Sequence, residues 1–160
     1  MHRPSISATL RALALIPLFA GCGGGAGTGP AAFPAALVGR WQAGPACAAA
    51  GCAINARVEG SSLVLPLTDT LTIDLQVSQG GAIVSTLAFA GQAPRIVQGL
   101  ARARGSTLIV DYPGSPSDTI AYAVQGALLR FDFQNALLLP DVTGDGTPDH
   151  LRMSVLFARQ

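Results

Sequence analysis

Apolar residues recur with a period of two over most of the chain after residue 37. The clearest example is the segment 71–78, in which apolar and polar residues alternate strictly. Its apolar positions are Leu71, Ile73, Leu75 and Val77, and its polar positions are Thr72, Asp74, Gln76 and Ser78. Because successive side chains of a β-strand point to opposite faces of its sheet, this pattern predicts a strand with one buried face.

The same pattern returns in further segments that are separated by glycine-containing turns, where glycine supplies the positive φ of tight hairpins. The predicted strands are 82–90, 95–103, 107–112, 119–124, 128–133 and 151–158, with 38–43 and 63–67 as additional candidates. No segment shows convincing helical periodicity. We therefore predict an all-β, antiparallel up-and-down barrel of about 8–10 strands, because closure removes exposed sheet edges. A β-sandwich is the alternative.

The first 21 residues have the layout of an export signal. His2, Arg3 and Arg11 accompany an apolar run, 12–20, that is too short to span a bilayer. The run ends in Ala20-Gly21-Cys22, which resembles the lipobox of bacterial lipoproteins. This resemblance implies cleavage before Cys22 and acylation of that residue, including with palmitate. It places the protein in the bacterial cell envelope, on the outer membrane rather than the inner one because glycine follows the cysteine. An ordinary secretory signal is the alternative.

The next segment consists mostly of Gly, Ala, Pro and Thr, with Phe33 as its one aromatic residue. Such a segment buries too little apolar surface to offset the entropy lost on ordering. We interpret 22–36 as a lipidated flexible tether. The alternative is that Phe33 docks on the domain and orders the end of the tether. The expected division is a signal peptide at 1–21, the tether at 22–36 and a β domain at 37–160.

A second resemblance concerns the two ends of this domain. Gly39-Arg40-Trp41 resembles the Gly-x-Trp motif that opens the first strand of lipocalins, and Arg159 ends the last predicted strand, where that family often has an arginine. The resemblance implies a lipocalin-like barrel that Arg159 closes at one end by stacking on Trp41. It also implies a small apolar ligand in the barrel mouth. Alternatively, side chains fill the barrel.

Two cysteines remain once Cys22 is assigned to the lipid. Cys47 and Cys52 lie between the turn formers Gly44-Pro45 and the next strand. In an oxidising compartment this spacing favours a local disulfide. A metal site would need neighbouring ligands, and a redox pair would need an electropositive setting; the sequence indicates neither.

The acidic segment 141–149 carries the most specific candidate chemistry. It resembles the Asp-x-Asn-x-Asp-Gly calcium loops of extracellular propeller repeats and dockerins. The candidate ligands are Asp141, Thr143, Asp145, Thr147 and Asp149. Arg152 stands where an EF-hand has its bidentate glutamate. We therefore expect weak, structural Ca²⁺ binding, with Kd of about 10⁻⁴–10⁻³ M. A solvated hairpin loop is the alternative.

Charge and catalytic motifs narrow the function further. The ten basic residues are all arginines and nine residues are acidic, so nucleic-acid binding has little support. Arg95, Arg102 and Arg104 indicate a solvated face or a weak basic strip. His150 is the one histidine after the signal, and the nucleophile-elbow motif and a phosphate loop are missing from the sequence.

We therefore predict a non-enzymatic, membrane-anchored lipocalin-like lipoprotein that binds a small apolar ligand. The main alternative is a structural or interaction lipoprotein of the envelope, with a calcium-stabilised loop and no small-molecule ligand. A hydrolase that uses strand-end carboxylates such as Asp111, Asp118 and Asp132 is a third hypothesis.

Overall fold

The computed structural model describes residues 32–134, 137–139, 146–147 and 149–160. This part of the chain contains eleven strands and two short 3₁₀ turns. The elements are η1 (Ala35–Leu37), β1 (Gly39–Ala43), η2 (Pro45–Ala50), β2 (Ala53–Val58), β3 (Val64–Pro66), β4 (Leu71–Val77), β5 (Ala82–Phe89), β6 (Arg95–Arg104), β7 (Thr107–Asp111), β8 (Asp118–Gln125), β9 (Leu128–Phe133), β10 (Leu137–Leu139) and β11 (Asp149–Arg159). Within these ranges, neither helical turn is long and apolar enough to cross a membrane.

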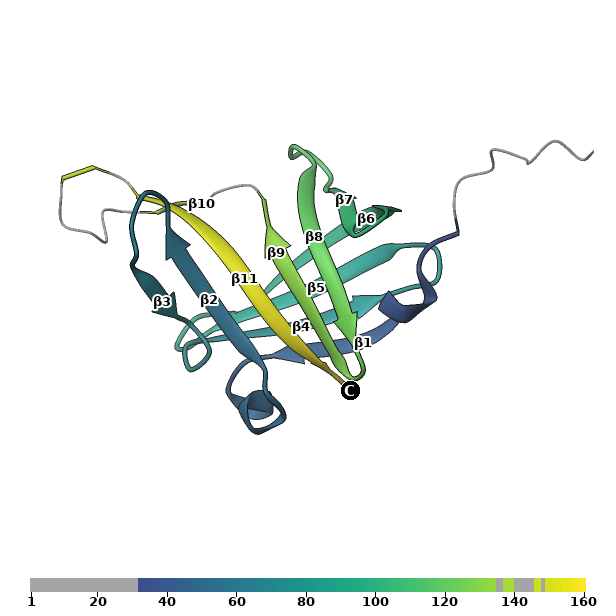
Figure 1. Ribbon diagram of the computed structural model, residues 1–160, viewed down its shortest axis with the longest axis horizontal. Coiled ribbons are helices and arrows are strands. Elements are labelled where there is room, and N and C mark those ends of the chain that lie inside the picture. The colour runs from purple at the N-terminus through teal and green to yellow at the C-terminus, as the bar shows by residue number, and fades with distance from the viewer. Residues whose placement is uncertain (1–31, 135–136, 140–145, 148) are drawn as a thin grey trace, which may run out of the picture. The chain divides into compact units, whose positions relative to one another are not determined.

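The strands form one closed antiparallel barrel (Figure 1). Neighbours follow the order β1-β4-β5-β6-β7-β8-β9-β11, and β11 returns to β1 through the pairs Trp41↔Arg159 and Gln42↔Ala158. Eight strands thus make a complete ring. The prediction of an antiparallel up-and-down barrel is confirmed, and the chain forms one closed sheet rather than the two stacked sheets of a sandwich.

Two of the barrel strands are interrupted. Along one edge of β11, residues 151–156 pair with β2 and residues 158–159 pair with β1. The first barrel strand is therefore β1 and β2 in succession, with η2 as an excursion between them. Its neighbour is built the same way, because β3 pairs with β2 and β4 pairs with β1. This splitting explains how eleven strand segments form a ring of eight.

The alternation in the sequence separates the two surfaces of the barrel. Inward-facing residues of nine strand segments join one buried core cluster, which includes Ile73, Leu108 and Val155. Phe131 is central to it, with edge-to-face contacts to Phe157 at 5.5 Å and to Phe133 at 6.4 Å between ring centroids. Side chains typically fill the interior of an eight-stranded barrel, and the inward-facing residues here pack into this one cluster.

One end of the barrel is closed by the segment before β1. The indole Nε1 of Trp41 donates a 2.9 Å hydrogen bond to the carbonyl of Leu37, which is fully buried. The guanidinium of Arg159 lies 4.2 Å from the centroid of the Trp41 ring. It also donates to the carbonyl oxygens of Val38, at 3.1 Å, and Ala36, at 2.7 Å. The contact is the one that the lipocalin resemblance implied.

The folded domain begins before residue 37. Phe33 packs against the core. Its ring lies so close to Gly81 that a Cβ added to this glycine would be 3.0 Å from the ring. Residues 33–36, the end of the predicted tether, therefore belong to the barrel unit, as the alternative of a docked Phe33 requires. The physical reason is that the aromatic ring and Leu37 together supply enough apolar contact to order this short segment.

Candidate binding sites

A shallow groove of about 460 Å³ lies on the outer surface of the barrel, over β8, β9, β11 and β2. These four strands run side by side in Figure 1. The groove residues alternate along each strand with core residues such as Leu129 and Val155, which places them on the outer face. The polar lining residues are Asn55, Gln125, Arg130 and Ser154, and the apolar ones are Ala53, Ala123, Leu128 and Leu156.

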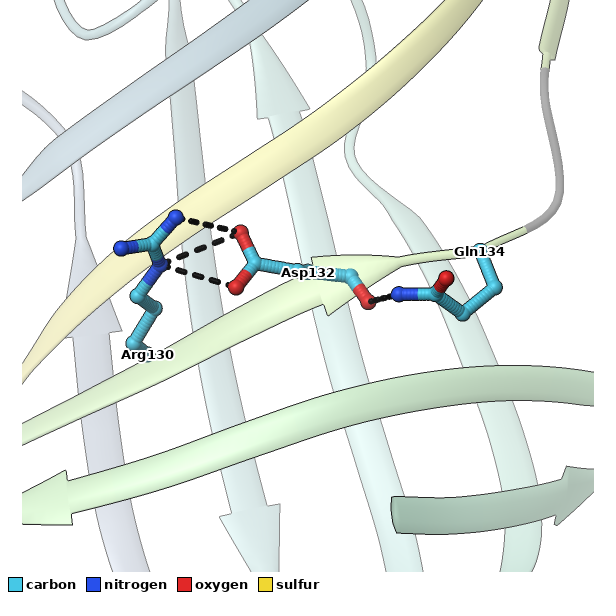
Figure 2. A network of polar contacts seen from close by, with 3 residues as sticks. All are labelled: Arg130, Asp132 and Gln134. Atoms are coloured by element: carbon cyan, nitrogen blue, oxygen red, sulfur yellow. Dashed lines mark hydrogen bonds and ion pairs between the residues drawn. The ribbon is translucent and has the colours of Figure 1, made fainter. Parts of the chain in front are cut away.

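Arg130 is held in place on this surface by its neighbour on the same face of β9 (Figure 2). Its Nε lies 2.8 Å from Asp132 Oδ2, and its Nη2 donates to Oδ1 at 3.0 Å. Gln134 Nε2 donates to the backbone carbonyl of Asp132 at 3.1 Å. The two charged side chains are 58% and 34% exposed. An exposed pair of this kind adds little stability, about 1 kcal/mol or less, but it orients the guanidinium beside the groove.

The disulfide loop borders the same groove. Cys47 and Cys52 are bonded, with their Cα atoms 5.6 Å apart. Both pack against Ala158 and Leu128 in a small cluster outside the main core. The predicted disulfide is thus present, and it fixes the excursion between β1 and β2 against the groove residue Leu128.

A second, smaller hollow of about 90 Å³ lies on the outer face over β1, β4 and β5. Asp74 is one of its lining residues and accepts a 3.0 Å hydrogen bond from Gln42 Nε2. Both hollows therefore open on the outer surface, whereas the inward-facing side chains pack into the core cluster. The small apolar ligand that the lipocalin resemblance places inside the barrel stays a prediction.

The other predicted site residues are only partly described. Cys22, Asp141, Thr143 and Asp145 lie outside the described residues. Thr147 is exposed, and Asp149 is buried, with 8% of its surface accessible, at the first residue of β11. Among the described residues there is no group of three or more His, Cys, Asp and Glu side chains that could hold a metal. Calcium binding stays a prediction.

Two of the strand-end carboxylates form exposed ion pairs. Asp111 lies 2.7 Å from Arg102 Nη2 and accepts a 2.5 Å hydrogen bond from Ser117, and Asp132 pairs with Arg130. These contacts are those of residues on a solvated strand face.

Sequence reasoning gave Tyr112 no role. The residue follows β7 and is half-buried, and Gly99 makes room for it, since a Cβ there would lie 3.0 Å from Tyr112 Cδ1. Burial raises the pKa of this phenol above its ordinary value of 10.0, and the negative charge of Asp118 raises it further. Tyr112 is therefore a neutral phenol at pH 7. The glycine opposite it on β6 was the available signal in the sequence.

Models of known protein families and curated proteins were compared with the chain, and none matches it.

Proposed function

We propose that the protein is a lipid-anchored lipoprotein of the bacterial envelope that binds a protein or peptide partner on its outer surface and catalyses no reaction. The observation that carries this proposal is the contrast between the two surfaces of the barrel. The inward-facing residues pack together in one core cluster, whereas the 460 Å³ groove opens on the outer surface. This arrangement favours the interaction lipoprotein over the carrier of an internal apolar ligand.

The chemistry of the groove supports this proposal. Leu128 and Leu156 offer apolar contact, while Asn55, Gln125 and Arg130 offer hydrogen bonds and charge. Protein interfaces combine an apolar centre with a polar rim, and arginine is enriched in them. The groove floor is a paired sheet and the disulfide loop adjoins it, so little conformational entropy is lost when a partner binds.

The first test is native mass spectrometry of the full chain, expressed with its own signal in a bacterial host and extracted without chelator. We expect the mass of residues 22–160 plus acyl groups, and no co-purifying small molecule. A Cys22→Ser variant should lose both the acyl mass and the membrane association. A bound apolar compound would contradict the packed-scaffold proposal and restore the ligand carrier. Absence of acyl mass would contradict the anchor.

The second test locates the interface. A photo-crosslinking amino acid is placed at Ser154, in the groove, or at Gln76, an outward position on β4 that lines the smaller hollow and serves as the matched control. Crosslinking in cells should give one adduct of defined mass from position 154 and not from position 76. Ser154→Arg, which fills the groove, should reduce capture of that same partner by a second, immunological assay. Equal adducts from both positions would count against the groove.

A further inference from the structure

We infer that the barrel rests on the bilayer through the outward face of β6, so that the groove points away from the membrane. This inference depends on the proposed lipid anchor, and the β6 face is defined here by Val84, Ile96, Leu100, Arg102, Arg104 and Ile109. Four observations support the inference. They are the exposed apolar side chains of β6, the place where the N-terminal segment joins the barrel, the arginines of β6, and the position of the groove on the other side of the ring.

The apolar part of the β6 face is unusually exposed for residues of a regular strand. Ile96 is 66% exposed and Leu100 is 51% exposed. Leu100 pairs with Ala82 on β5 and with Asp111 on β7, which makes Val84 and Ile109 its diagonal neighbours on the same face. Single exposed apolar residues are common on proteins. Here the two exposed side chains of β6 adjoin the half-buried Val84 and Ile109, so the apolar surface extends over three adjacent strands. The position of the chain gives this extended surface a further reason.

The N-terminal segment joins the barrel next to Leu100. Phe33 packs at Gly81, whose carbonyl accepts a 2.8 Å hydrogen bond from the backbone N–H of Ala101. Ala82 follows Gly81 and Leu100 precedes Ala101, and these two residues form the adjacent pair Ala82↔Leu100. Nine residues lie between Cys22 and Ala32, so the chain between their Cα atoms has ten steps and spans at most about 36 Å. An acylated Cys22 therefore keeps this edge of the barrel within a short distance of the bilayer.

The charge of the face suits a bilayer with anionic lipids. Arg102 and Arg104 extend the outward row of β6 beyond Leu100, and Arg95 stands exposed at the start of the strand. Asp111 is the acidic residue paired directly with this row, and it is bound to Arg102. Arginines beside exposed aliphatic side chains bind the boundary between headgroups and acyl chains.

Docking through β6 also leaves the groove accessible. In the ring of eight strands, β6 is separated from β11 by four steps in either direction, so the two strands lie on opposite sides of the barrel. The groove is centred on β9 and β11. A barrel lying on β6 thus presents the groove to the aqueous compartment, where a partner can reach it.

The test places a tryptophan on either side of the barrel. The full mature chain, acylated at Cys22, is reconstituted in vesicles of phosphatidylethanolamine and phosphatidylglycerol that contain brominated lipid. Leu100→Trp probes the β6 face, and Arg57→Trp, an exposed outward position on β2, is the matched control. Trp41 is buried in both variants and gives a common background. We expect the lipid to quench position 100 about threefold more strongly than position 57.

Equal quenching at both positions, or none at either, would overturn the inference, as would a dimer that shields position 100 in vesicles. An Ile96→Ser/Leu100→Ser variant should keep its thermal unfolding transition and lose vesicle-induced amide protection over β6. If Cys22 proves not to be acylated, the anchor fails separately. The same two tryptophan variants are then attached to nickel-chelating lipid through an N-terminal histidine tag. The ratio of quenching at positions 100 and 57 again tests whether β6 faces the bilayer.

Discussion

At the residue scale, Arg159 links the last strand to Trp41 on β1 and to the segment before β1. Its guanidinium covers the Trp41 ring and donates to two carbonyl oxygens of the segment before β1. The last strand thereby holds the first turn in place. Trp41 and Arg159 were predictable only through the Gly-x-Trp resemblance, since neither composition nor period links residues 118 positions apart.

We expect Arg159→Ala to lower the free energy of unfolding by about 2 kcal/mol, because a cation–π contact and two hydrogen bonds from a charged donor are lost. Arg57→Ala, an exposed position on β2, should cost less than about 0.5 kcal/mol and is the control. Urea denaturation followed by Trp41 fluorescence measures both. Equal losses would mean that Arg159 contributes no more than an ordinary surface arginine.

The raised pKa of Tyr112 predicts how the stability of the protein changes at alkaline pH. Its folded-state pKa lies above 10.0, so the folded protein holds the phenol proton more tightly than the unfolded chain. Stability should therefore be unaffected by this group below pH 10 and fall as the pH rises from 10 through the folded pKa. Because the chain has no lysine, few other groups titrate there. Tyr112→Phe should remove the late phase of the 295 nm absorbance titration and part of the alkaline destabilisation. A late phase that persists in the variant would refute the assignment.

At the scale of single elements, the pattern of apolar residues located most strands but not their interruptions. The predicted segment 71–78 exceeds β4 by one residue and the predicted segment 128–133 matches β9, because strict alternation is a strong signal. The strand Ala53–Val58 was not predicted, because alanines at positions 53 and 56 weaken the difference in hydropathy between its two faces. The strand β10 is too short to show a period. Docking of Phe33 was the alternative to a flexible tether, and the sequence could not decide between the two because its contact Gly81 is distant in sequence.

Gly81 offers a sharp test of that packing. It has φ +82°, and an added Cβ would run into the carbonyl oxygen of Ala101 and the ring of Phe33. Gly60 has φ +74° with nothing within 4 Å of the same position. Gly60→Ala should therefore cost about 1 kcal/mol of conformational strain, whereas Gly81→Ala should cost about 3 kcal/mol or more. Equal shifts in thermal denaturation would show that neither the Ala101 carbonyl nor the Phe33 ring restricts the space at Gly81.

The disulfide stabilises the excursion between β1 and β2. It closes a short loop, with five residues of separation, so its effect on the unfolded chain is about 2 kcal/mol. Reductant should lower the melting temperature of the wild type accordingly. A Cys47→Ser/Cys52→Ser variant should start at the lower value and show no response to reductant. A response in the double variant would point to another cause.

At the scale of the whole molecule, the sequence predicted the closed barrel but not which of its surfaces carries a groove. Alternation separates inward from outward residues, yet it cannot tell whether the inward set leaves a cavity. That depends on how Phe131, Phe133 and Phe157 fit together across strands that are distant in sequence. The groove escaped prediction for the same reason, because its lining comes from four strands and only their pairing brings it together.

The packed interior can be tested by emptying part of it. Phe157→Ala should lower the free energy of unfolding by about 4 kcal/mol and leave an apolar cavity. Benzene should then raise the melting temperature of the variant and not that of the wild type, because small dry cavities bind such molecules. Stabilisation of the wild type by benzene would reveal an internal site already present.

The pairing of β11 also determines when the fold can be completed. This one strand contacts β1, β2, β9 and β10, so the first and the last parts of the chain meet along it. A ribosome releases the N-terminus first, and the hairpins from β4 to β9 can form while β11 is still unmade. Until then the growing sheet carries two open edges, which are templates for aggregation. Ring closure therefore depends on the eleven residues of β11, and loss of even a short piece of this strand should convert the closed barrel into an edge-exposed, self-associating sheet.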